Sequence, residues 1–499
     1  MKLLFKIGIM IMRVAVISLS VWAIYELFKN KDQWLEILLI CLYFPSLICS
    51  MIIFINKRNS IAKLTWLFFV LAIPVLGPFL YIIFAGRYKK RISQKKYLEK
   101  YKFANKEVKE VTEKVHPLLK NISDYSKKPV VKGNIDSSRR IMDSFVNLFE
   151  DIKKAKNFIH MHYYIIKSSE IWDELRQLLI QKNKEGVEIR IIVDDFGSWK
   201  LPWYDFKQLR KHGIEIKLFN KVIFPFISSE ALFRTHRKYT IIDGEIAYIG
   251  GANIADEYIS FMPKYGAWED IVSKIDGDIM TNINSLFIID WYFVSQQKLS
   301  KEKYNPNIKI NSLEINSKSS NMVLIEETPE IKESIFEDIL SNLIYNAKKE
   351  IKLSSPYFVP SVALLKSLQV AAMKGIKITI YIPGLADKKI VLFASKIFAN
   401  ELLPYGVKVK QLNKKFLHSK IGLFDKEIAY IGTSNLDYRS LFSQFENNLF
   451  FEGEPTKQID SIFKIYNSNS KNLEFESKES RNFWKRFKFC IAKIIAPVL

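Results

Sequence analysis

The feature that most constrains this chain is an internal duplication, marked by two copies of one short motif. Residues 236–243 read HRKYTIID and residues 418–425 read HSKIGLFD. Each copy has a His, a Lys two positions later and an Asp five positions after the Lys, although the chain has only 6 histidines among 499 residues. An Asn, Asn253 or Asn435, follows each His at the same distance. Such repeated matches are not accidental, so we expect two equivalent halves around one shared site.

The sequence around the motifs is also duplicated, and it predicts the fold class. Residues 144–166 resemble residues 334–360, and each segment has the pattern of an amphipathic helix followed by a strand. Residues 173–195 resemble residues 363–384, where a helix ends near a Gly and leads into a strand rich in β-branched residues. Strands that alternate with helices favour a mixed sheet covered by helices. We therefore predict an α/β fold of two mixed-sheet halves with pseudo-two-fold symmetry.

The N-terminal part is apolar. Residues 64–85 carry no charge, residues 34–55 carry one, and residues 3–27 are interrupted by two basic side chains. Stretches of this length suit transmembrane helices, although residues 3–27 also fit a helix that lies in the membrane interface. We expect two or three transmembrane helices here.

Positive charge dominates the rest of the chain. The formal net charge is +23, and such an excess attracts nucleic acids, anionic lipid headgroups or phosphorylated substrates. Residues 87–100 carry seven Lys and Arg directly after the apolar segments. By the positive-inside rule, this run predicts a multi-pass protein of the cell membrane with a cytoplasmic catalytic part. Residues 481–499 alternate basic and apolar side chains, which favours a helix lying on an anionic membrane over one packed on the catalytic part.

These patterns divide the chain into five parts. In order they are a membrane anchor (1–86, with helices at about 3–27, 34–55 and 64–85), a basic linker (87–130), a first half (131–305), a second half (306–480) and a basic amphipathic tail (481–499).

The duplicated motif has a definite chemical potential. On a strand, residues at positions i and i+2 face the same side, so each His lies beside the Lys of its own motif. An imidazole can act as a nucleophile or as a general acid and base near neutral pH, and an ammonium group binds phosphate. Amide groups such as those of Asn253 and Asn435 can donate to phosphate oxygens. Two copies supply two histidines, so that one can attack while the other protonates the leaving group, which is covalent catalysis without metal.

The two motifs resemble the HKD motifs of the phospholipase D superfamily. Within it, HRKYTIIDGEIAYIGGANIADEY and FLHSKIGLFDKEIAYIGTSNLDYRSLFSQFENN are similar to segments of bacterial cardiolipin synthases. The resemblance extends over nearly the whole chain and includes the P-x-x-G-x-x-x-Y pattern from Pro74 to Tyr81 and the SPYFVP stretch at 355–360.

The resemblance implies a phosphatidyl transfer with no cofactor and no metal. One His forms a phosphohistidine with the phosphatidyl group of phosphatidylglycerol and expels glycerol, and a second phosphatidylglycerol then attacks to give cardiolipin. It makes His236 the nucleophile and His418 the acid and base, although the duplication leaves the reverse assignment open. The remaining residues that it implicates are Lys238, Lys420, Asn253 and Asn435, which hold the phosphate, and Asp243 and Asp425, which belong to the catalytic motifs and are expected to support the strands.

Two further carboxylates are carried over from the family. Asp270 is expected to orient His236, and Glu446 to orient His418, each within its own half. The sequence departs from the family pattern at Glu269, where Arg is usual, and at Ser443, where Asn is common.

Several alternatives remain open. A phospholipase D-type hydrolase or a phosphatidylserine synthase differs only in the acceptor, which the motifs do not specify. A nuclease would share the site, but the apolar N-terminus argues against nucleic acid as the partner and favours anionic lipids. A non-catalytic scaffold is disfavoured because both motifs are intact. His160 and His162 alternate on one strand, where they favour site-lining or core positions over a metal pair.

Overall fold

The structure is a computed structural model, and it describes two compact units. The described residues are 34–56, 60–85, 114–222, 233–259, 266–304, 319–329, 334–475 and 490–493, together with residues 18, 22, 25 and 111. One unit lies within residues 1–87 and the other comprises most of residues 88–499. Most of the first apolar segment, the basic run at 87–100 and nearly all of the tail therefore fall outside the described residues.

The N-terminal unit contains three described helices. They are α2 (Trp34–Ile55), α3 (Ser60–Ala72) and α4 (Leu76–Phe84). The prediction of one continuous helix over 64–85 is wrong, because the chain bends around Pro74 and α4 packs back against α3 through Trp66 and Tyr81. The bend requires Gly77, where an added Cβ would lie 2.3 Å from the Phe69 carbonyl oxygen. Among the described residues, we find no helix that combines the length and the apolar character needed to cross a bilayer.

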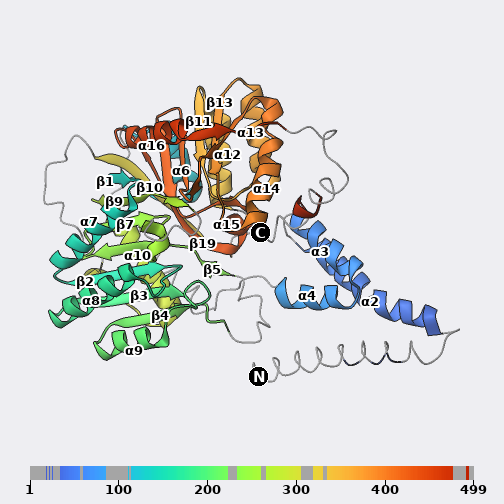
Figure 1. Ribbon diagram of the computed structural model, residues 1–499, viewed down its shortest axis with the longest axis horizontal. Coiled ribbons are helices and arrows are strands. Elements are labelled where there is room, and N and C mark those ends of the chain that lie inside the picture. Colours follow the sequence, from blue (N-terminus) through green and yellow to red (C-terminus); the bar gives the residue numbers. More distant parts are fainter. Residues whose placement is uncertain are drawn as a thin grey trace. The chain divides into compact units, whose positions relative to one another are not determined.

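The larger unit is built on a 16-stranded sheet with two matching halves. The first half has the strand order β1-β9-β7-β6-β2-β3-β4, and the second has the order β10-β19-β17-β16-β11-β13-β14-β20. The central strands β1 and β10 pair antiparallel, with Val131 opposite Met322 (Figure 1). The first-half strands are β1 (Val131–Ser138), β2 (Phe158–Tyr163), β3 (Glu188–Asp194), β4 (Glu215–Phe219), β6 (Tyr239–Ile242), β7 (Ile246–Gly250) and β9 (Val272–Asp276). The second-half strands are β10 (Ser320–Glu327), β11 (Glu350–Ser354), β13 (Lys377–Pro383), β14 (Lys408–Leu412), β16 (Ile421–Phe424), β17 (Ile428–Gly432), β19 (Gln444–Glu452) and β20 (Ser470–Asn472).

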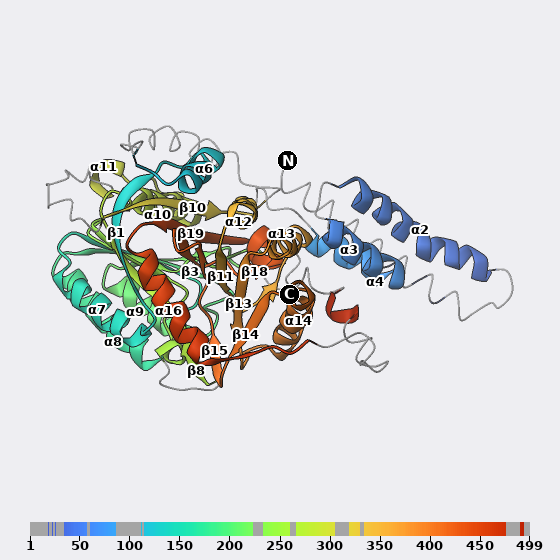
Figure 2. The ribbon, with the colours of Figure 1, turned by 90° about the horizontal axis from the view of Figure 1, so that it is seen from above.

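Helices cover both faces of this sheet (Figure 2). On one face of the first half are α7 (Ile141–Lys154), α8 (Glu170–Lys184) and α9 (Trp203–Lys211), which share an apolar core with the strands. Their counterparts in the second half are α12 (Ile335–Asn346), α13 (Val362–Met373) and α14 (Lys389–Asn400). On the other face, α10 (Met280–Ser295) and α16 (Thr456–Ser468) contribute to one core that spans both halves. The predicted duplicated α/β fold is therefore confirmed.

Short elements complete the unit. They are α6 (Pro117–Ser126), α11 (Lys301–Tyr304), α15 (Tyr438–Ser443), η3 (Asp256–Ile259), η4 (Leu403–Tyr405), β5 (Arg234–Thr235), β8 (Ala267–Glu269), β12 (Phe358–Val359), β15 (Lys415–Leu417) and β18 (Leu436–Asp437). Residues 117–126 were assigned to the linker, but the structure places them in α6, against β10 and β19.

Local sequence explains why equivalent elements form in both halves. The strands β3 and β13 read EIRIIVD and KITIYIP, and nearly continuous β-branched runs of this kind suit strands that helices bury. Serine side chains cap the N-termini of the helices that precede these two strands. Ser169 accepts a hydrogen bond from the Trp172 amide in α8, and Ser361 accepts one from the Leu364 amide in α13.

The aspartates of the two motifs lie at the far ends of their strands, away from the histidines. The Asp243 carboxylate accepts hydrogen bonds of 2.7–2.9 Å from the backbone amides of residues 156–158, just before β2. Asp425 accepts three equivalent bonds of 2.7–2.8 Å from residues 348–350, before β11. Both aspartates adopt a positive φ, of 53° and 51°. Their grouping with the catalytic residues is therefore corrected, since they fix the entry of a neighbouring strand and do not reach the site.

Replacement of Asp243 by Ala should destabilise the fold more than it affects chemistry. Three backbone amides, two of them exposed and one partly buried, lose a charged acceptor. We expect this loss to cost about 2 kcal/mol, because water can replace the acceptor at the exposed positions. The thermal midpoint in detergent should fall, and the fraction that remains folded should retain most of its turnover. Asp243→Asn keeps one acceptor oxygen and tolerates a positive φ, so its thermal midpoint should lie between those of Asp243→Ala and the unsubstituted protein. Loss of turnover in Asp243→Ala with an unchanged midpoint would contradict this structural role.

Candidate active site

The two motif histidines meet at one site between the halves. His236 precedes β6, which runs antiparallel to β2, so it lies beside the C-terminal end of β2. His418 precedes β16 and lies in the same way beside the end of β11. Both side chains are buried. Burial is the main cause that lowers the pKa of both histidines, and the lysine of the same motif comes next. The lysine of the other half then lowers each pKa further, Lys420 for His236 and Lys238 for His418, so the groups of both halves act within one electrostatic site.

Two short strand pairings carry the backbone of each half into the other. In the first, β5 runs parallel to the start of β19, and the His236 amide donates to the Phe445 carbonyl at 2.8 Å. In the second, β15 runs parallel to β8, and the His418 amide donates to the Glu269 carbonyl at 2.7 Å. Each accepting carbonyl belongs to the residue just before a buried carboxylate, so each histidine is brought next to the carboxylate of the opposite half.

The histidine–carboxylate pairs are therefore crossed. His236 Nδ1 lies 3.0 Å from both carboxyl oxygens of Glu446, and His418 Nδ1 lies 2.6 Å from Asp270 Oδ2. The expectation that each carboxylate serves the histidine of its own half is wrong. Sequence proximity suggested pairing within a half, whereas the parallel contacts β5–β19 and β15–β8 exchange the partners. Asp270 and Glu446 themselves lie at the site and contact the histidines.

The surroundings of His236 fix its tautomer. Its Nδ1 also lies 3.0 Å from the backbone carbonyl oxygen of Thr433. A carbonyl oxygen can only accept, so Nδ1 carries the hydrogen and Nε2 presents its lone pair. Burial lowers the pKa of His236 well below its usual value, which keeps the ring neutral. A neutral imidazole with a free Nε2 lone pair is suited to nucleophilic attack.

His418 has a different environment. Its Nδ1 faces Asp270, which accepts, and the Lys420 ammonium group, which donates at 2.8 Å. Nδ1 can therefore exist with or without a hydrogen, and Nε2 can carry a proton toward a leaving group. Burial raises the pKa of Asp270 to about 6 and that of Glu446 to about 8, so Asp270 is the more readily ionised partner near neutral pH. An ionised partner supports the imidazolium form that a general acid requires.

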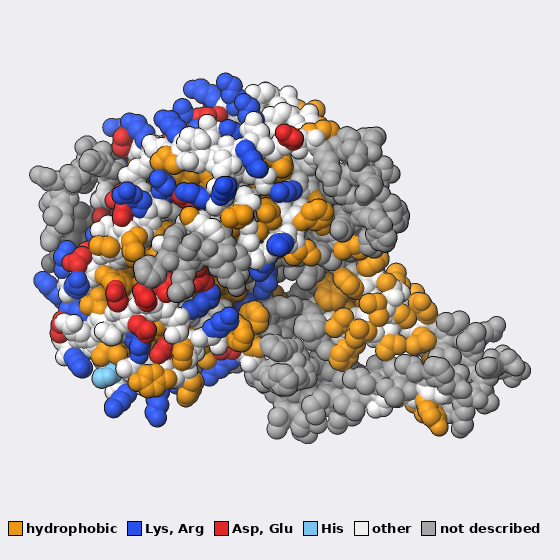
Figure 3. Space-filling view, in the orientation of Figure 1, with side chains coloured by type: hydrophobic (Ala, Val, Ile, Leu, Met, Phe, Trp, Pro, Cys, Tyr) orange, Lys and Arg blue, Asp and Glu red, His pale blue; other side chains and the backbone are white. Residues whose placement is uncertain are grey.

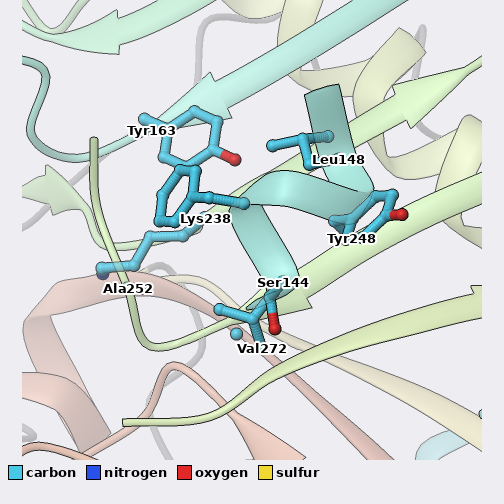
Figure 4. A pocket seen from close by; sticks show the side chains of 9 residues that line it. Ser144, Leu148, Tyr163, Lys238, Tyr248, Ala252 and Val272 are labelled. Carbon is cyan, nitrogen blue, oxygen red and sulfur yellow. The ribbon is translucent and has the colours of Figure 1, made fainter. Parts of the chain in front are cut away.

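The two motif lysines are buried beside the histidines. Lys238 Nζ donates to the His236 carbonyl oxygen at 2.5 Å, and Lys420 Nζ donates to the carbonyl oxygen of His418. Lys238 also lines a small, mainly apolar pocket with Leu148 of α7 and Tyr163 of β2 (Figure 4). Burial lowers the pKa of Lys238 well below its usual value and that of Lys420 to about 8. A bound phosphate would restore the charge of both groups.

The two asparagines are buried but differ in their contacts. Asn253 accepts from the Ile165 amide at 2.9 Å and donates to the Tyr258 hydroxyl at 2.6 Å. Asn435 Oδ1 has no hydrogen-bond partner within the described part of the chain. Of the two amides, Asn435 therefore has fewer hydrogen-bond partners among the described residues.

Aromatic and charged neighbours that the sequence did not single out complete the site. The Tyr164 ring lies 5.3 Å from the His236 ring, and the Trp268 ring lies 5.1 Å from the His418 ring. Arg237, between the motif His and Lys, pairs with buried Asp290 and donates to the Glu446 carbonyl oxygen at 3.2 Å. Because Arg237 lies between the motif His and Lys, the sequence could have indicated that it is near the site. Asp290 lies in α10, where no sequence pattern indicates a contact with the site.

The remaining polar candidates have structural partners. His162 Nδ1 contacts Asp290 at 3.0 Å, and His160 stacks on Phe287 at 4.1 Å, in line with the core role that we favoured. Glu269 pairs with Lys415 and lies 3.2 Å from Arg139, so the departure from the usual Arg is matched by cations nearby. Across the described ranges, no cluster of three or more His, Cys, Asp or Glu side chains could hold a metal ion.

Comparisons with known proteins agree with this geometry. The family described as "Cardiolipin synthase, PLD-like domain" matches residues 148–291 and 340–466, and "Phospholipase_D-nuclease N-terminal" matches residues 45–86. A cardiolipin synthase from Geobacillus sp. (strain WCH70) is 32% identical and aligns over 98% of this chain and 99% of its own length. The major cardiolipin synthase ClsA of Bacillus subtilis (strain 168) is 31% identical over 91% of this chain and 97% of its own length.

A solved structure shares the fold. Phosphatidylserine synthase from Haemophilus influenzae Rd KW20 superposes with a TM-score of 0.58 and 13% identity, over 77% of this chain and 100% of its own. The duplicated sheet and the paired His–Lys site thus define a phospholipase D-like enzyme. Because the family match and the relatives cover so much of the sequence, the chain belongs to the cardiolipin synthase family.

The activity should depend on pH with one limb on each side of neutrality. Asp270, with a raised pKa of about 6, is ionised above that pH and neutral below it, and Lys420, with a lowered pKa of about 8, is charged below that pH and neutral above it. We therefore expect kcat/KM for micellar phosphatidylglycerol to rise through pH 6 and to fall through pH 8. Asp243→Asn, outside the site, should keep both limbs. A profile that stays flat from well below pH 6 to well above pH 8 would show that neither group titrates during the reaction.

Gly251→Ala should disable the site by displacing Asp270. A Cβ at this position would lie 2.2 Å from Asp270 Oδ1, so the carboxylate must move away from His418. We expect kcat to fall about 100-fold, the scale of a lost general acid, with little change in the thermal midpoint. In an Asp270→Ala background the same substitution should have almost no further effect. Additive losses in the double variant would contradict a coupling through Asp270.

Proposed function

We propose that this chain is a phosphatidyltransferase that makes cardiolipin and glycerol from two molecules of phosphatidylglycerol. The observation that carries the proposal is the pairing of two buried histidines, each held by a carboxylate of the opposite half and flanked by a buried lysine. The names of the relatives supply the product.

In the first step, we assign the attack to His236. Its Nε2 lone pair forms a bond to the phosphorus of phosphatidylglycerol, and the bond from phosphorus to the glycerol oxygen breaks. The leaving oxygen takes the proton of His418 Nε2, and glycerol departs. Lys238 and Lys420 bind the phosphate oxygens, with the amide of Asn435 as a further donor. The fixed tautomer of His236 and the readily ionised Asp270 beside His418 support this assignment over the reverse one.

In the second step, the roles of the histidines are completed. His418, now neutral, takes the proton from the terminal hydroxyl of a second phosphatidylglycerol. That oxygen bonds to phosphorus, and the bond to His236 Nε2 breaks, which releases cardiolipin and restores both side chains. Burial of both histidines limits the access of water, which would otherwise give phosphatidic acid.

We also propose that the N-terminal unit attaches the enzyme to the cell membrane. Large apolar side chains of α2 are exposed, among them Phe44, Met51 and Phe54, and a bilayer would cover them. The basic run at 87–100 favours a cytoplasmic position for the catalytic unit.

The transferase is tested with labelled phosphatidylglycerol and the full-length protein in lipid–detergent micelles, with products separated by thin-layer chromatography. We expect labelled cardiolipin and free glycerol, and a loss of at least about 1,000-fold in His236→Ala and His418→Ala, because each histidine is needed in both steps. His212→Ala, outside the site, should retain full activity. Phosphatidic acid as the only product would identify a hydrolase.

The order of the histidines can be read separately. Quenching with alkaline detergent during turnover should trap a lipid-derived phosphoryl label on the protein, stable to base and labile to acid. The label should be absent from His236→Ala and present in His418→Ala when a substrate with a good leaving group bypasses the general acid. Label in His236→Ala alone would reverse the assignment.

A further inference from the structure

The segment between β3 and the middle of α9 exposes four large aromatic side chains. Trp199 is 72% exposed, Trp203 67%, Tyr204 66% and Phe196 48%. We call these four residues the aromatic patch. Aromatic side chains gathered in this way on a surface mark a contact with a partner or a membrane.

Cations surround the aromatic patch, and the acids of the same segment turn inward. Lys200 Nζ lies 5.5 Å from the Trp199 ring centre, and the Arg210 guanidinium lies 5.5 Å from that of Trp203. Lys207 and Lys211 on α9 are exposed as well. In the space-filling view, apolar side chains over α9 are bordered by Lys and Arg (Figure 3). The acidic side chains of the segment, by contrast, have partners within the protein. Asp194 pairs with buried Arg234, and Asp195 accepts a hydrogen bond from the Val222 amide. Asp205 accepts one from the Trp172 indole.

The aromatic patch is one layer of side chains from the site. Ser198, in the middle of the segment, donates to the Tyr164 carbonyl oxygen at 3.1 Å, and Gly197 packs directly on Tyr164. The Tyr164 ring in turn lies 5.3 Å from the ring of His236. Whatever covers the aromatic patch therefore lies close to the first histidine.

The equivalent segment of the second half has the same chemistry. Between β13 and α14, Leu385 and Ile390 are exposed on either side of exposed Lys388 and Lys389. This segment also lies near the site, because Asp387, which accepts from the Tyr357 hydroxyl at 2.6 Å, is among the carboxylates that act on the charge of Lys420. The two segments follow β3 and β13, which run parallel to β2 and β11, so both segments begin at the edge of the sheet where the histidines lie. Apolar and cationic side chains therefore border the site in each half.

We propose that the aromatic patch inserts into the interfacial region of an anionic lipid bilayer and delivers the site to its substrate there. Trp and Tyr favour the depth of the lipid headgroups, and Lys and Arg beside them pair with lipid phosphates. A bilayer also explains why both halves expose such a segment, since it is an extended surface. The inference rests on the proposed function, because the proposed substrate, phosphatidylglycerol, is a lipid of that bilayer.

The contact is tested by labelling the full-length protein in proteoliposomes. In a background with Cys41, Cys49 and Cys490 replaced by Ser, cysteines introduced as Trp199→Cys and Met373→Cys would carry an environment-sensitive fluorophore. Met373 is 71% exposed but lies at the end of α13, just before the start of β13 and so at the opposite end of the strands from the histidines. With vesicles of phosphatidylglycerol and phosphatidylcholine, we expect a blue shift and quenching by headgroup-level spin labels at position 199 and neither at 373. No quenching at 199, or equal quenching at both, would overturn the proposal.

Kinetics distinguish a surface role from a failure of the proposed function. Trp199→Ala/Trp203→Ala should raise the apparent KM for vesicular phosphatidylglycerol about tenfold, which corresponds to a loss of about 1.4 kcal/mol in binding. Its turnover of a short-chain, monomeric phosphatidylglycerol should equal that of the unsubstituted protein. Equal losses on both substrates would place the two tryptophans in the fold or the site and overturn the proposal. Failure of the unsubstituted protein to turn over either lipid would reject the proposed function, while the quenching result would still decide the membrane contact.

Discussion

The site depends on the exchange of carboxylates between the two halves. Each histidine is paired through its backbone with the other half, and its Nδ1 then meets a carboxylate that follows directly in that half. Neither half alone would contain a histidine with an oriented ring. The pseudo-two-fold arrangement is thus a condition for the chemistry, because it places both nucleophile and acid at one phosphorus and supports each from across the axis.

Burial makes these few groups strongly interdependent. Two lysines, two histidines and two carboxylates share an interior where each charge is costly unless another offsets it. Burial lowers the pKa values of the lysines and histidines and raises those of Asp270 and Glu446, so these groups carry less charge than their composition suggests. A phosphate diester supplies the missing negative charge, which couples substrate binding to the charged forms that catalysis requires.

The duplication has not kept the halves identical, and their differences give the two histidines different surroundings. Arg237 follows His236 and contacts Asp290 and the Glu446 carbonyl, whereas Ser419 follows His418 and bonds to the hydroxyls of Ser354 and Tyr466. Gly251 leaves room for Asp270, whereas its counterpart Thr433 supplies the carbonyl that fixes the tautomer of His236.

The sequence by itself determined the duplicated α/β fold and the residues of the site. Periodicity and the repeated His–Lys–Asn spacing are local properties, and equivalent strands and caps form from equivalent segments. The separation of the motif aspartates from the site is visible only in space: the four residues between Lys238 and Asp243 form β6, which carries Asp243 to the opposite end of the sheet.

Only the tertiary structure decided which carboxylate serves which histidine. Pairing across the axis depends on the contacts of β5 with β19 and of β15 with β8, between residues about 150 to 210 positions apart, and no local pattern encodes them. The same holds for the bend at Pro74 that divides α3 from α4, where hydropathy is uniform but packing against Gly77 redirects the chain. Periodicity records which face of an element is buried, whereas the identity of the partner is set by how distant elements pack together.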